Sequence, residues 1–428
     1  WHHVRERFNV RSRKVHHSFC MIKFSEHYAL SEAVNSHMTH LADKVFMGGV
    51  NGTREAINTL RAVRDTLQNK GGSTITTKID GAPAVFLGVD PSDGKFFVSK
   101  KGIFNKNPVV YKTQADIDKD LSGELHDKFS ILLKECAKLG VSGIVQGDLL
   151  FTPGDLSKQT IDGQTYITFQ PNTIVYAVPA GSDLAKKITK AKIGIAFHTT
   201  YTGKDFTSLQ ANFGEKIVTK LKQVSTIWAI DAIYENETGK ANFTPAESKH
   251  VSESLSNIGK LFNSASADII NHISNDEEAQ KLVLIYVNSR IRAGKKRDSG
   301  IVMAGEFLKF VHDRYKTEIE KKKSDKGKES METSRSRVIK YLLGVKTSDL
   351  GKVFDLAYAL DDTKNVIVDV LNRASSLNHF LRTESGFKIT APEGFVAINS
   401  DGNAVKLVDR LEFAAANFSK DVLKGWQK

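Results

Sequence analysis

Lys78 is the residue whose surroundings most strongly suggest chemistry. It ends a β-branched run, Thr74 to Thr77, and the turn-forming residues Asp80 and Gly81 follow it. β-Branched residues favour extended backbone, so we expect a strand that ends at Lys78 and a tight turn that uses the permissive backbone of Gly81. Burial between two strands lowers the pKa of a lysine and frees its amine as a nucleophile. The alternative interpretation is a surface hairpin with an exposed lysine.

Carboxylates, cations and one aromatic residue occur in later segments that have the pattern of strands. Asp148 interrupts the apolar stretch 143–151, and Glu393 precedes the stretch 394–399. Carboxylates are hard oxygen donors that suit Mg²⁺ or ribose hydroxyls, and phosphoryl transfer needs cations that neutralise charge at phosphorus. Each residue also has a structural interpretation, as a turn former, a core residue or a solubilising charge. The cations and the aromatic residue of these segments are Lys100, Tyr176, Lys406 and Arg410.

Strands and turns are expected to position these side chains. Turn residues at 91–94 separate two apolar runs and predict a hairpin over 84–100. His198, in one of the later apolar runs, is interpreted as a core histidine. Helical spacing predicts helices within 24–67, where Thr53 should cap the second one, and at 116–139. Further strands are predicted at 143–151, 166–169, 173–178, 192–200, 387–389, 394–399 and 404–408, with a turn at 400–403.

The hydrophobic pattern of the sequence changes between about residues 205 and 386, where amphipathic helical patterns replace strand patterns. Helices are predicted there at 216–233, 252–273, 277–292, 305–321, 334–343 and 353–381, and a short one at 411–423. The expected organisation has four parts: a leader or expression remnant at 1–20, N-terminal helices at 21–72, a core at 73–203 plus 387–428, and a helical insertion at 204–386.

The net charge of the chain favours a polyanionic partner. Lys and Arg number 61 and Asp and Glu 49 among 428 residues, a formal charge of +12. Nucleic acid is the first expectation and an anionic membrane surface the second, with solubility as the alternative reason. Basic clusters around Lys295 and Lys321 are expected to contact phosphates, unless they are only solvated helix faces. No apolar run predicts a membrane span. Two cysteines far apart predict neither a disulfide framework nor a zinc site, which suits a reducing cytosol.

Taken in order, the candidate residues resemble the motifs of the ATP-dependent covalent nucleotidyltransferases, the superfamily of RNA ligases, DNA ligases and mRNA capping enzymes. Lys78-Ile79-Asp80-Gly81 matches the Lys-x-Asp-Gly signature, in which the lysine is the nucleophile. Ser99-Lys100-Lys101-Gly102 resembles the next motif, with Lys100 in the place of an arginine. Gly147-Asp148 resembles a Gly-Glu pair that binds ribose. Tyr176 occupies the place of the aromatic residue that stacks on the purine.

The resemblance continues after the helical stretch. Glu393-Gly394-Phe395-Val396 matches the motif whose glutamate supports the catalytic metal, and Lys406 lies where a lysine grips the α-phosphate. The family has a second lysine where this chain has Val408, and Arg410 is a candidate substitute. The stretch after Arg410 is too short for the additional domain of DNA ligases and capping enzymes, which favours the RNA-ligase branch. The whole chain also resembles proteins of large tailed bacteriophages.

The resemblance implies an α+β fold: an antiparallel-sheet nucleotidyltransferase core, similar to ATP-grasp ligases, with a large all-helical insertion. It implies an ATP-dependent polynucleotide ligase, RNA more than DNA, that uses Mg²⁺ or Mn²⁺ held by Asp148 and Glu393. The nucleotide-binding residues that it implies, besides Asp148 and Glu393, are Thr77, Asp80, Gly81, Lys100, Tyr176, Lys406 and Arg410. Lys100, Lys406 and the metal should lower the pKa of Lys78. The expected partners are RNA or DNA ends and no membrane, for a monomer in the cytoplasm, that of the host cell if phage-encoded. The alternatives are a DNA ligase, a capping-type enzyme that uses GTP, and a degenerate phage protein that binds nucleic acid without chemistry.

Overall fold

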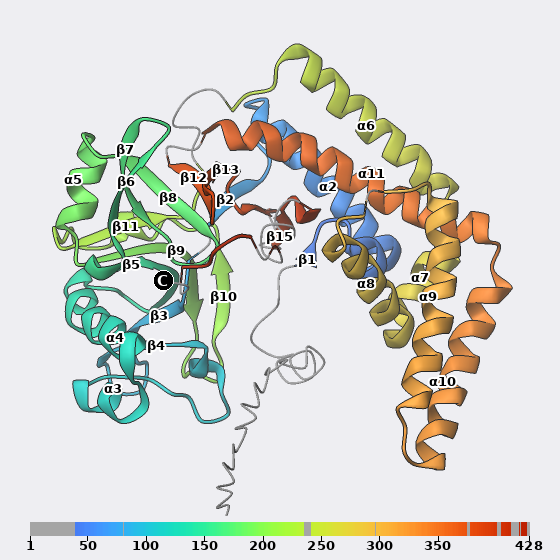
Figure 1. Cartoon of the computed structure of the whole chain (residues 1–428), viewed down its shortest axis with the longest axis horizontal. Helices are drawn as coiled ribbons and strands as arrows, with labels where there is room; N and C mark the ends of the chain where they lie inside the picture. The colour runs from blue at the N-terminus through green and yellow to red at the C-terminus, as the bar shows by residue number, and fades with distance from the viewer. Residues whose placement is uncertain are drawn as a thin grey trace, which may run out of the picture. The chain divides into compact units, whose positions relative to one another are not determined.

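The computed structural model describes residues 39–79, 81–234, 241–295, 297–374, 377–399, 404–411, 419 and 421–425. The expected leader at 1–20, the turn at 400–403, Asp80 and most of the helix predicted at 411–423 lie outside these residues. The described chain is a mixed α+β protein with largely antiparallel sheets and a helical region (Figure 1).

Sheet A joins the two ends of the described chain. Its strands are, in spatial order, β1 (Thr39–His40), β15 (Ala404–Leu407), β14 (Gly394–Ile398) and β2 (Thr74–Lys78). The β1–β15 pair is parallel and the other two pairs are antiparallel. Alternate residues of these strands point to opposite faces. One face, with Ile75, Phe395 and Leu407, packs into the largest hydrophobic cluster of the protein.

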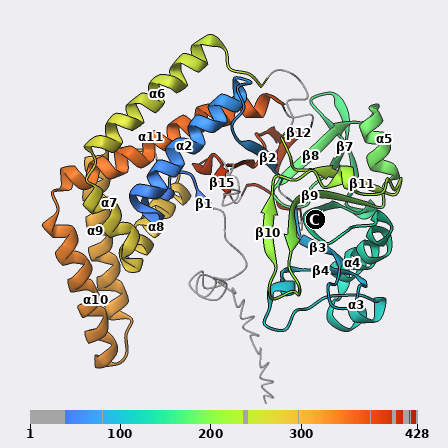
Figure 2. The ribbon, with the colours of Figure 1, turned by 180° about the vertical axis from the view of Figure 1, so that it is seen from behind.

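Sheet B lies at the centre of the strand-rich part. Its strands follow the order β10 (Gln210–Phe213), β9 (Ile193–Thr202), β5 (Ile144–Phe151), β3 (Ala84–Val89) and β4 (Phe96–Ser99), and β11 (Ile227–Asp231) pairs with β9 in parallel. Helices α3 (Gln114–Asp120) and α4 (Gly123–Cys136) lie beside β3 and β4 (Figure 2). Phe129 and Leu132 of α4 join Val85 and Val145 of the sheet in one apolar cluster.

Sheet C completes the strand-rich part. Its order is β13 (Gly386–Ile389), β12 (Asn378–Thr383), β8 (Ile174–Pro179), β7 (Gln164–Phe169) and β6 (Ser157–Ile161), with antiparallel pairing throughout. Helix α5 (Asp183–Lys190) packs Ala185 and Ile188 into a cluster that also contains Tyr176 and Trp228. Strands distant in the sequence, β8 and β12, are thus neighbours in this sheet.

Some helices of the helical region have clear start signals. At the start of α6, Thr244 and Glu247 form a capping box, and Pro245 occupies the first turn. The Asp276 carboxylate caps α8. Phe354 and Leu360 pack with sheet A in the largest cluster. The helices are α1 (Lys44–Met47), α2 (Gly49–Leu67), α6 (Pro245–Ser264), α7 (Ala267–Asn275), α8 (Glu277–Arg292), α9 (Gly300–Glu320), α10 (Asp325–Gly344) and α11 (Thr347–Leu371). Short 3-10 turns occur at Lys101–Phe104, Ala137–Leu139, Pro153–Asp155, Val218–Lys220 and Asn372–Ala374.

Several predicted helices are wrong. The segment 216–233 is a 3-10 turn followed by strand β11, and its apolar residues pack on sheet B instead of forming a helical stripe. The end of the helix predicted over 353–381 is strand β12. Thr53 lies inside α2, where its hydroxyl donates to the Gly49 carbonyl, and so it is no cap. The helix predicted over 277–292 is confirmed by α8. Strands β10, β11 and β12 therefore lie within the range assigned to the helical insertion.

Among the described residues, no helix combines the length and the apolar character that crossing a membrane requires.

Candidate functional site

Lys78 and Glu393 meet at the end of sheet A. Lys78 is the last residue of β2 and lies opposite Gly394 of β14, so Glu393 directly precedes that pairing. The Lys78 ammonium donates a hydrogen bond to Glu393 Oε1 and forms an ion pair with it. The side chain of Lys78 is 29% exposed and that of Glu393 7%. A lysine within reach of solvent is thus held against a buried carboxylate.

Lys406 lies on the same face of sheet A. It pairs with Val396 of β14, which in turn pairs with Thr76, and Lys78 follows Thr76 by two residues. In a β-strand such residues share a face. Burial lowers the pKa of Lys406, and the positive charge of Lys78 lowers it further. Two lysines from opposite ends of the chain therefore contribute positive potential to the same face.

His40 is a member of this group that sequence reasoning missed. It pairs with Lys406 across the parallel β1–β15 contact. Its Nδ1 atom is buried without a hydrogen-bond partner among the described residues. Burial, and then the charges of Arg410 and Lys406, lower the pKa of His40 well below its usual range, which keeps the ring neutral. Because a two-residue strand leaves no periodic pattern, the sequence carried no signal for it.

Asp148 and His198 approach Lys78 from sheet B. Asp148 pairs with Ala84 and Ala196, and His198 falls at a bulge where the β5–β9 register shifts. Bulges re-aim side chains, and here His198 Nε2 lies 3.7 Å from Asp148 Oδ2. Burial and the nearby charge of Lys78 lower the pKa of His198 to about 4. The sequence interpretation of His198 as a plain core residue therefore omitted its proximity to Asp148 and Lys78.

Gly81, in the turn after Lys78, packs closely against the strand that carries Asp148. A Cβ atom at Gly81 would lie 2.4 Å from the Asp148 Cβ, so any other residue would force the two segments apart. The Ala82 amide also donates to the Leu149 carbonyl, at 3.0 Å. Close approach thus explains the glycine of the Lys-x-Asp-Gly turn. Asp80, the other predicted residue of the turn, lies outside the described residues.

A recess of about 340 Å³ opens beside Lys78. Its lining includes Thr77, Lys78, Tyr176 and Trp228. Tyr176 is 2% exposed because Phe169 stacks on one face of its ring, with centroids 5.3 Å apart, and His379 packs edge-on against it. Two of the predicted nucleotide-binding residues, Thr77 and Tyr176, therefore share a cavity wall with Lys78.

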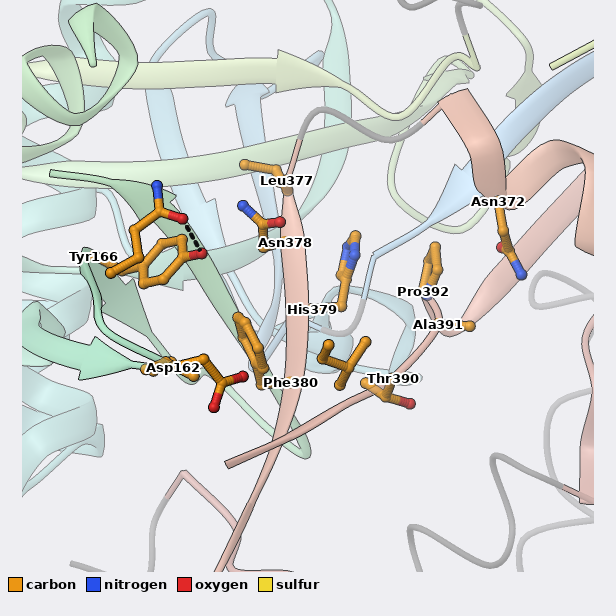
Figure 3. Close-up of a pocket in the computed structure, with 13 residues that line it drawn as sticks. Asp162, Tyr166, Asn372, Leu377, Asn378, His379, Phe380, Thr390, Ala391 and Pro392 are labelled. Carbon is orange, nitrogen blue, oxygen red and sulfur yellow. Dashed lines mark hydrogen bonds between the residues drawn. The ribbon is translucent and has the colours of Figure 1, made fainter. Parts of the chain in front are cut away.

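A second pocket, of about 360 Å³, adjoins this recess. The two share Leu377, His379 and Pro392 as lining residues. Figure 3 shows His379 beside Asn378 on β12, with Pro392 nearby. Pro392 directly precedes Glu393, so the lining of the second pocket includes the residue next to the carboxylate partner of Lys78.

Two predicted phosphate-binding cations are engaged elsewhere. Lys100 lies 3.5 Å from Asp120 and over the ring of Tyr111. The guanidinium of Arg410 donates to Asp43 at 2.7 Å and also to Asn288. The charge of Arg410 still acts on His40 and Lys406.

Lys364 of α11 provides a cation that the sequence did not suggest. Its ammonium donates to the Val408 carbonyl at 2.5 Å and pairs with Asp361 at 2.6 Å, and its side chain is 2% exposed. Val408 is the residue that stands where the resemblance calls for a second lysine. The helical region thus places a buried positive charge against the end of β15.

Of the two predicted metal ligands, Glu393 contacts Lys78, and Asp148 lies beside His198, on which the charge of Lys78 acts. Within the described residues, no cluster of three or more histidine, cysteine or carboxylate side chains could hold a metal. Mg²⁺ commonly binds through one or two carboxylates together with substrate phosphates and water. A pair of carboxylates fits that mode of binding, and it does not fit a site built from protein ligands alone.

These features define an α+β protein with a lysine–carboxylate site between antiparallel sheets. Residues 35–422 match the family described as "Family of unknown function (DUF6267)", and the chain belongs to that family. Searches of curated proteins and of solved structures found no match.

Acid is expected to destabilise the protein through its buried histidines. Burial lowers the pKa of His379 from about 6.5 to about 4. Between these values the unfolded chain binds more protons than the folded one, so stability rises with pH across this window and is lost as pH falls toward 4. From pH 7 to pH 5 this histidine should contribute a loss of about 2 kcal/mol in the free energy of unfolding. Urea unfolding of the wild type and of His379→Gln at both pH values measures it. An equal loss in the two proteins would contradict the assignment.

Proposed function

We propose that this protein is an ATP-dependent polynucleotide ligase that acts through a covalent lysyl-AMP, with RNA ends as the preferred substrate over DNA ends. The observation that carries the proposal is the convergence of Lys78, Glu393 and Lys406 in neighbouring strands of one sheet. These residues come from distant parts of the chain, and each lies in a segment that resembles a motif of the nucleotidyltransferases. The net charge of +12 is consistent with a polyanionic substrate.

Lys78 is the proposed nucleophile. The ammonium first passes a proton to Glu393, which already accepts its hydrogen bond. The neutral amine then attacks the α-phosphorus of ATP, the bond to the β-phosphate oxygen breaks, and pyrophosphate leaves with the electron pair. Loss of a second proton from the nitrogen leaves Lys78 joined to AMP. Lys406 lies on the same face of the sheet and would offset negative charge at the phosphate.

Two further transfers complete the proposed reaction. An oxygen of a nucleic-acid 5′-phosphate attacks the phosphorus of lysyl-AMP, the P–N bond breaks, and Lys78 regains its proton. A 3′-hydroxyl then gives up its proton and attacks the phosphorus of the adenylylated 5′-phosphate. The phosphoanhydride bond to AMP breaks, AMP leaves with the electron pair, and the phosphodiester bond forms. Asp148 and Glu393 are the carboxylates that would hold Mg²⁺ or Mn²⁺, and the metal would supply charge neutralisation at the phosphates.

The recess beside Lys78 is the proposed nucleotide pocket. Thr77 and Tyr176 line it together with Lys78, and Trp228 and Tyr234 add aromatic surface. Tyr234 contributes a buried hydroxyl that has no hydrogen-bond partner among the described residues. Buried polar groups are usually satisfied, so this hydroxyl is a candidate partner for a bound nucleotide.

A nucleic-acid-binding protein without the chemistry is the second candidate. The observation in its favour is Arg410, whose guanidinium is held by Asp43 and Asn288 and is thereby kept from an α-phosphate. Lys100 is likewise occupied by Asp120. This candidate predicts nucleic-acid binding with no covalent nucleotide.

A labelling experiment separates the candidates. We expect the protein to form a covalent adduct with α-labelled ATP and Mg²⁺ that survives denaturation and is cleaved by hot acid, as a P–N bond is, and to form none with α-labelled GTP. Addition of pyrophosphate should remove the label, because the first step is then reversed. An adduct with GTP alone would favour a capping-type enzyme, and no adduct with either nucleotide would favour the second candidate. Joining assays on RNA, DNA and mixed ends then identify the substrate.

A further inference from the structure

A large recess lies in the helical region, apart from the residues of the proposed reaction. It has a volume of about 630 Å³ and is lined by residues of α8 and α9 and of the segments that follow each helix. Lys295 comes from the segment after α8 and Lys321 from the end of α9. One lysine from each of the two basic clusters that the sequence singled out therefore lines the same site, which we name the α8–α9 recess.

The lining of the α8–α9 recess carries an excess of positive charge. Three carboxylates line it, Glu306, Asp313 and Glu318, against five cations. Among the described residues, neither Lys295 nor Arg314 has an acidic partner within ion-pair distance, whereas the other cations do. The five cations are Arg290, Lys295, Lys309, Arg314 and Lys321.

An aromatic side chain is present among these charges. Phe310 is half-buried in the lining and its ring centroid lies 5.5 Å from that of Tyr286, which is itself buried. The Tyr286 hydroxyl donates a hydrogen bond of 3.2 Å to the Met303 carbonyl, which holds the ring in place. Phe310 is therefore backed by a rigid ring, and part of its surface lines the recess.

Cations beside an aromatic surface are typical of sites that bind single-stranded nucleic acid. Phosphates contact the cations, and an unstacked base packs on the ring whatever its sequence. A base-paired duplex covers the faces of its internal bases and offers only phosphates to such a site. The combination of Phe310 with unpaired cations thus favours an unpaired strand.

We propose that the α8–α9 recess binds an unpaired segment of a polynucleotide strand. Lys295 and Arg314 contact its phosphates, and one base packs against Phe310. The preference for a polynucleotide over other polyanions rests in part on the proposed ligase function. In that function the recess would hold a strand by a part that is not being joined.

Binding of a labelled single-stranded RNA oligonucleotide, followed by fluorescence anisotropy over a series of salt concentrations, tests the inference. Combined Lys295→Glu and Arg314→Glu should weaken binding at least about 10-fold and lower the salt slope by about two phosphate contacts. Lys260→Glu is the matched control, because Lys260 is exposed on α6 and outside the recess, and it should have little effect. Equal effects of the two reversals would overturn the proposal.

Phe310 separates a strand site from a general phosphate site. Phe310→Leu should weaken single-strand binding about 10-fold, and Phe310→Tyr should restore it, because the tyrosine keeps a ring for stacking. A blunt duplex should bind more weakly than the single strand and should not respond to Phe310→Leu. If a duplex or free ATP binds as tightly as the single strand and competes for the recess, the proposal is wrong.

These measurements do not depend on adenylylation. Lys78→Ala should bind the single strand as the wild type does, since Lys78 lies outside the recess. Absence of an adduct in the wild-type protein, with intact strand binding, would overturn the proposed function alone. The present inference alone would be overturned if Lys78 formed the adduct but substitutions of Lys295, Arg314 and Phe310 left strand binding unchanged.

Discussion

Replacing Lys78 with arginine is expected to abolish adduct formation with ATP, a loss of at least about 10³-fold in rate. Arginine keeps the positive charge and can still pair with Glu393. Its guanidinium cannot lose a proton in a protein, so it offers no nucleophilic nitrogen. The substitution therefore separates a nucleophile from a structural cation. Incubation with α-labelled ATP and Mg²⁺, followed by denaturing electrophoresis, measures the effect.

Lys112→Arg is a suitable control for this experiment. The Lys112 side chain is 23% exposed, close to the 29% of Lys78, and it pairs with Asp90 and Asp93. It should label as the wild type does. An adduct of normal intensity in Lys78→Arg would contradict the assignment of Lys78, because another residue would then carry the nucleotide.

Replacing Glu393 with glutamine should lower the rate of adduct formation by about 10² to 10³-fold. The amide has the shape of the carboxylate and still accepts a hydrogen bond, but it neither takes a proton from Lys78 nor helps to hold a metal. Because Glu393 is only 7% exposed, loss of its charge also leaves the Lys78 ammonium without its buried counter-charge. Single-turnover labelling at saturating ATP measures the rate, and urea unfolding measures stability in parallel.

Glu55→Gln provides the matched comparison. Glu55 pairs with Lys44 at 2.6 Å, an ordinary lysine–glutamate pair on the helices. Its loss should change neither labelling nor, by more than about 1 kcal/mol, the free energy of unfolding. An unchanged labelling rate in Glu393→Gln would show that this carboxylate has no part in the first step.

Much of the fold near Lys78 was predictable, because local signals and tertiary pairing agree there. The β-branched run before Lys78 forms β2, and the turn at 91–94 joins β3 to β4 as expected. Strand β11 was missed since its apolar residues also satisfy helical spacing, and only pairing with β9 decides its conformation. Strand β12 was also missed, because its conformation depends on pairing with β8, which is distant in the sequence.

The candidate site was predictable only in part. Residue types and their order pointed to Lys78, Glu393 and Lys406. The structure pairs Lys78 with Glu393 at the end of sheet A and places Lys406 on the same face of the sheet as Lys78. His40 and Lys364 were not predictable, because each reaches β15 through a long-range contact that leaves no local pattern. Arg410 illustrates the reverse limit: its position suggested a phosphate ligand, but its partner Asp43 lies in a segment that the sequence did not connect to it.

Peptide mapping of the protein after incubation with ATP and Mg²⁺ is the most direct test of the central claim. The account predicts that one peptide gains the mass of AMP, that fragmentation places the AMP on Lys78 Nζ, and that pyrophosphate removes it. An unmodified Lys78 in a folded protein that binds ATP, or AMP attached to a different side chain, would contradict the account.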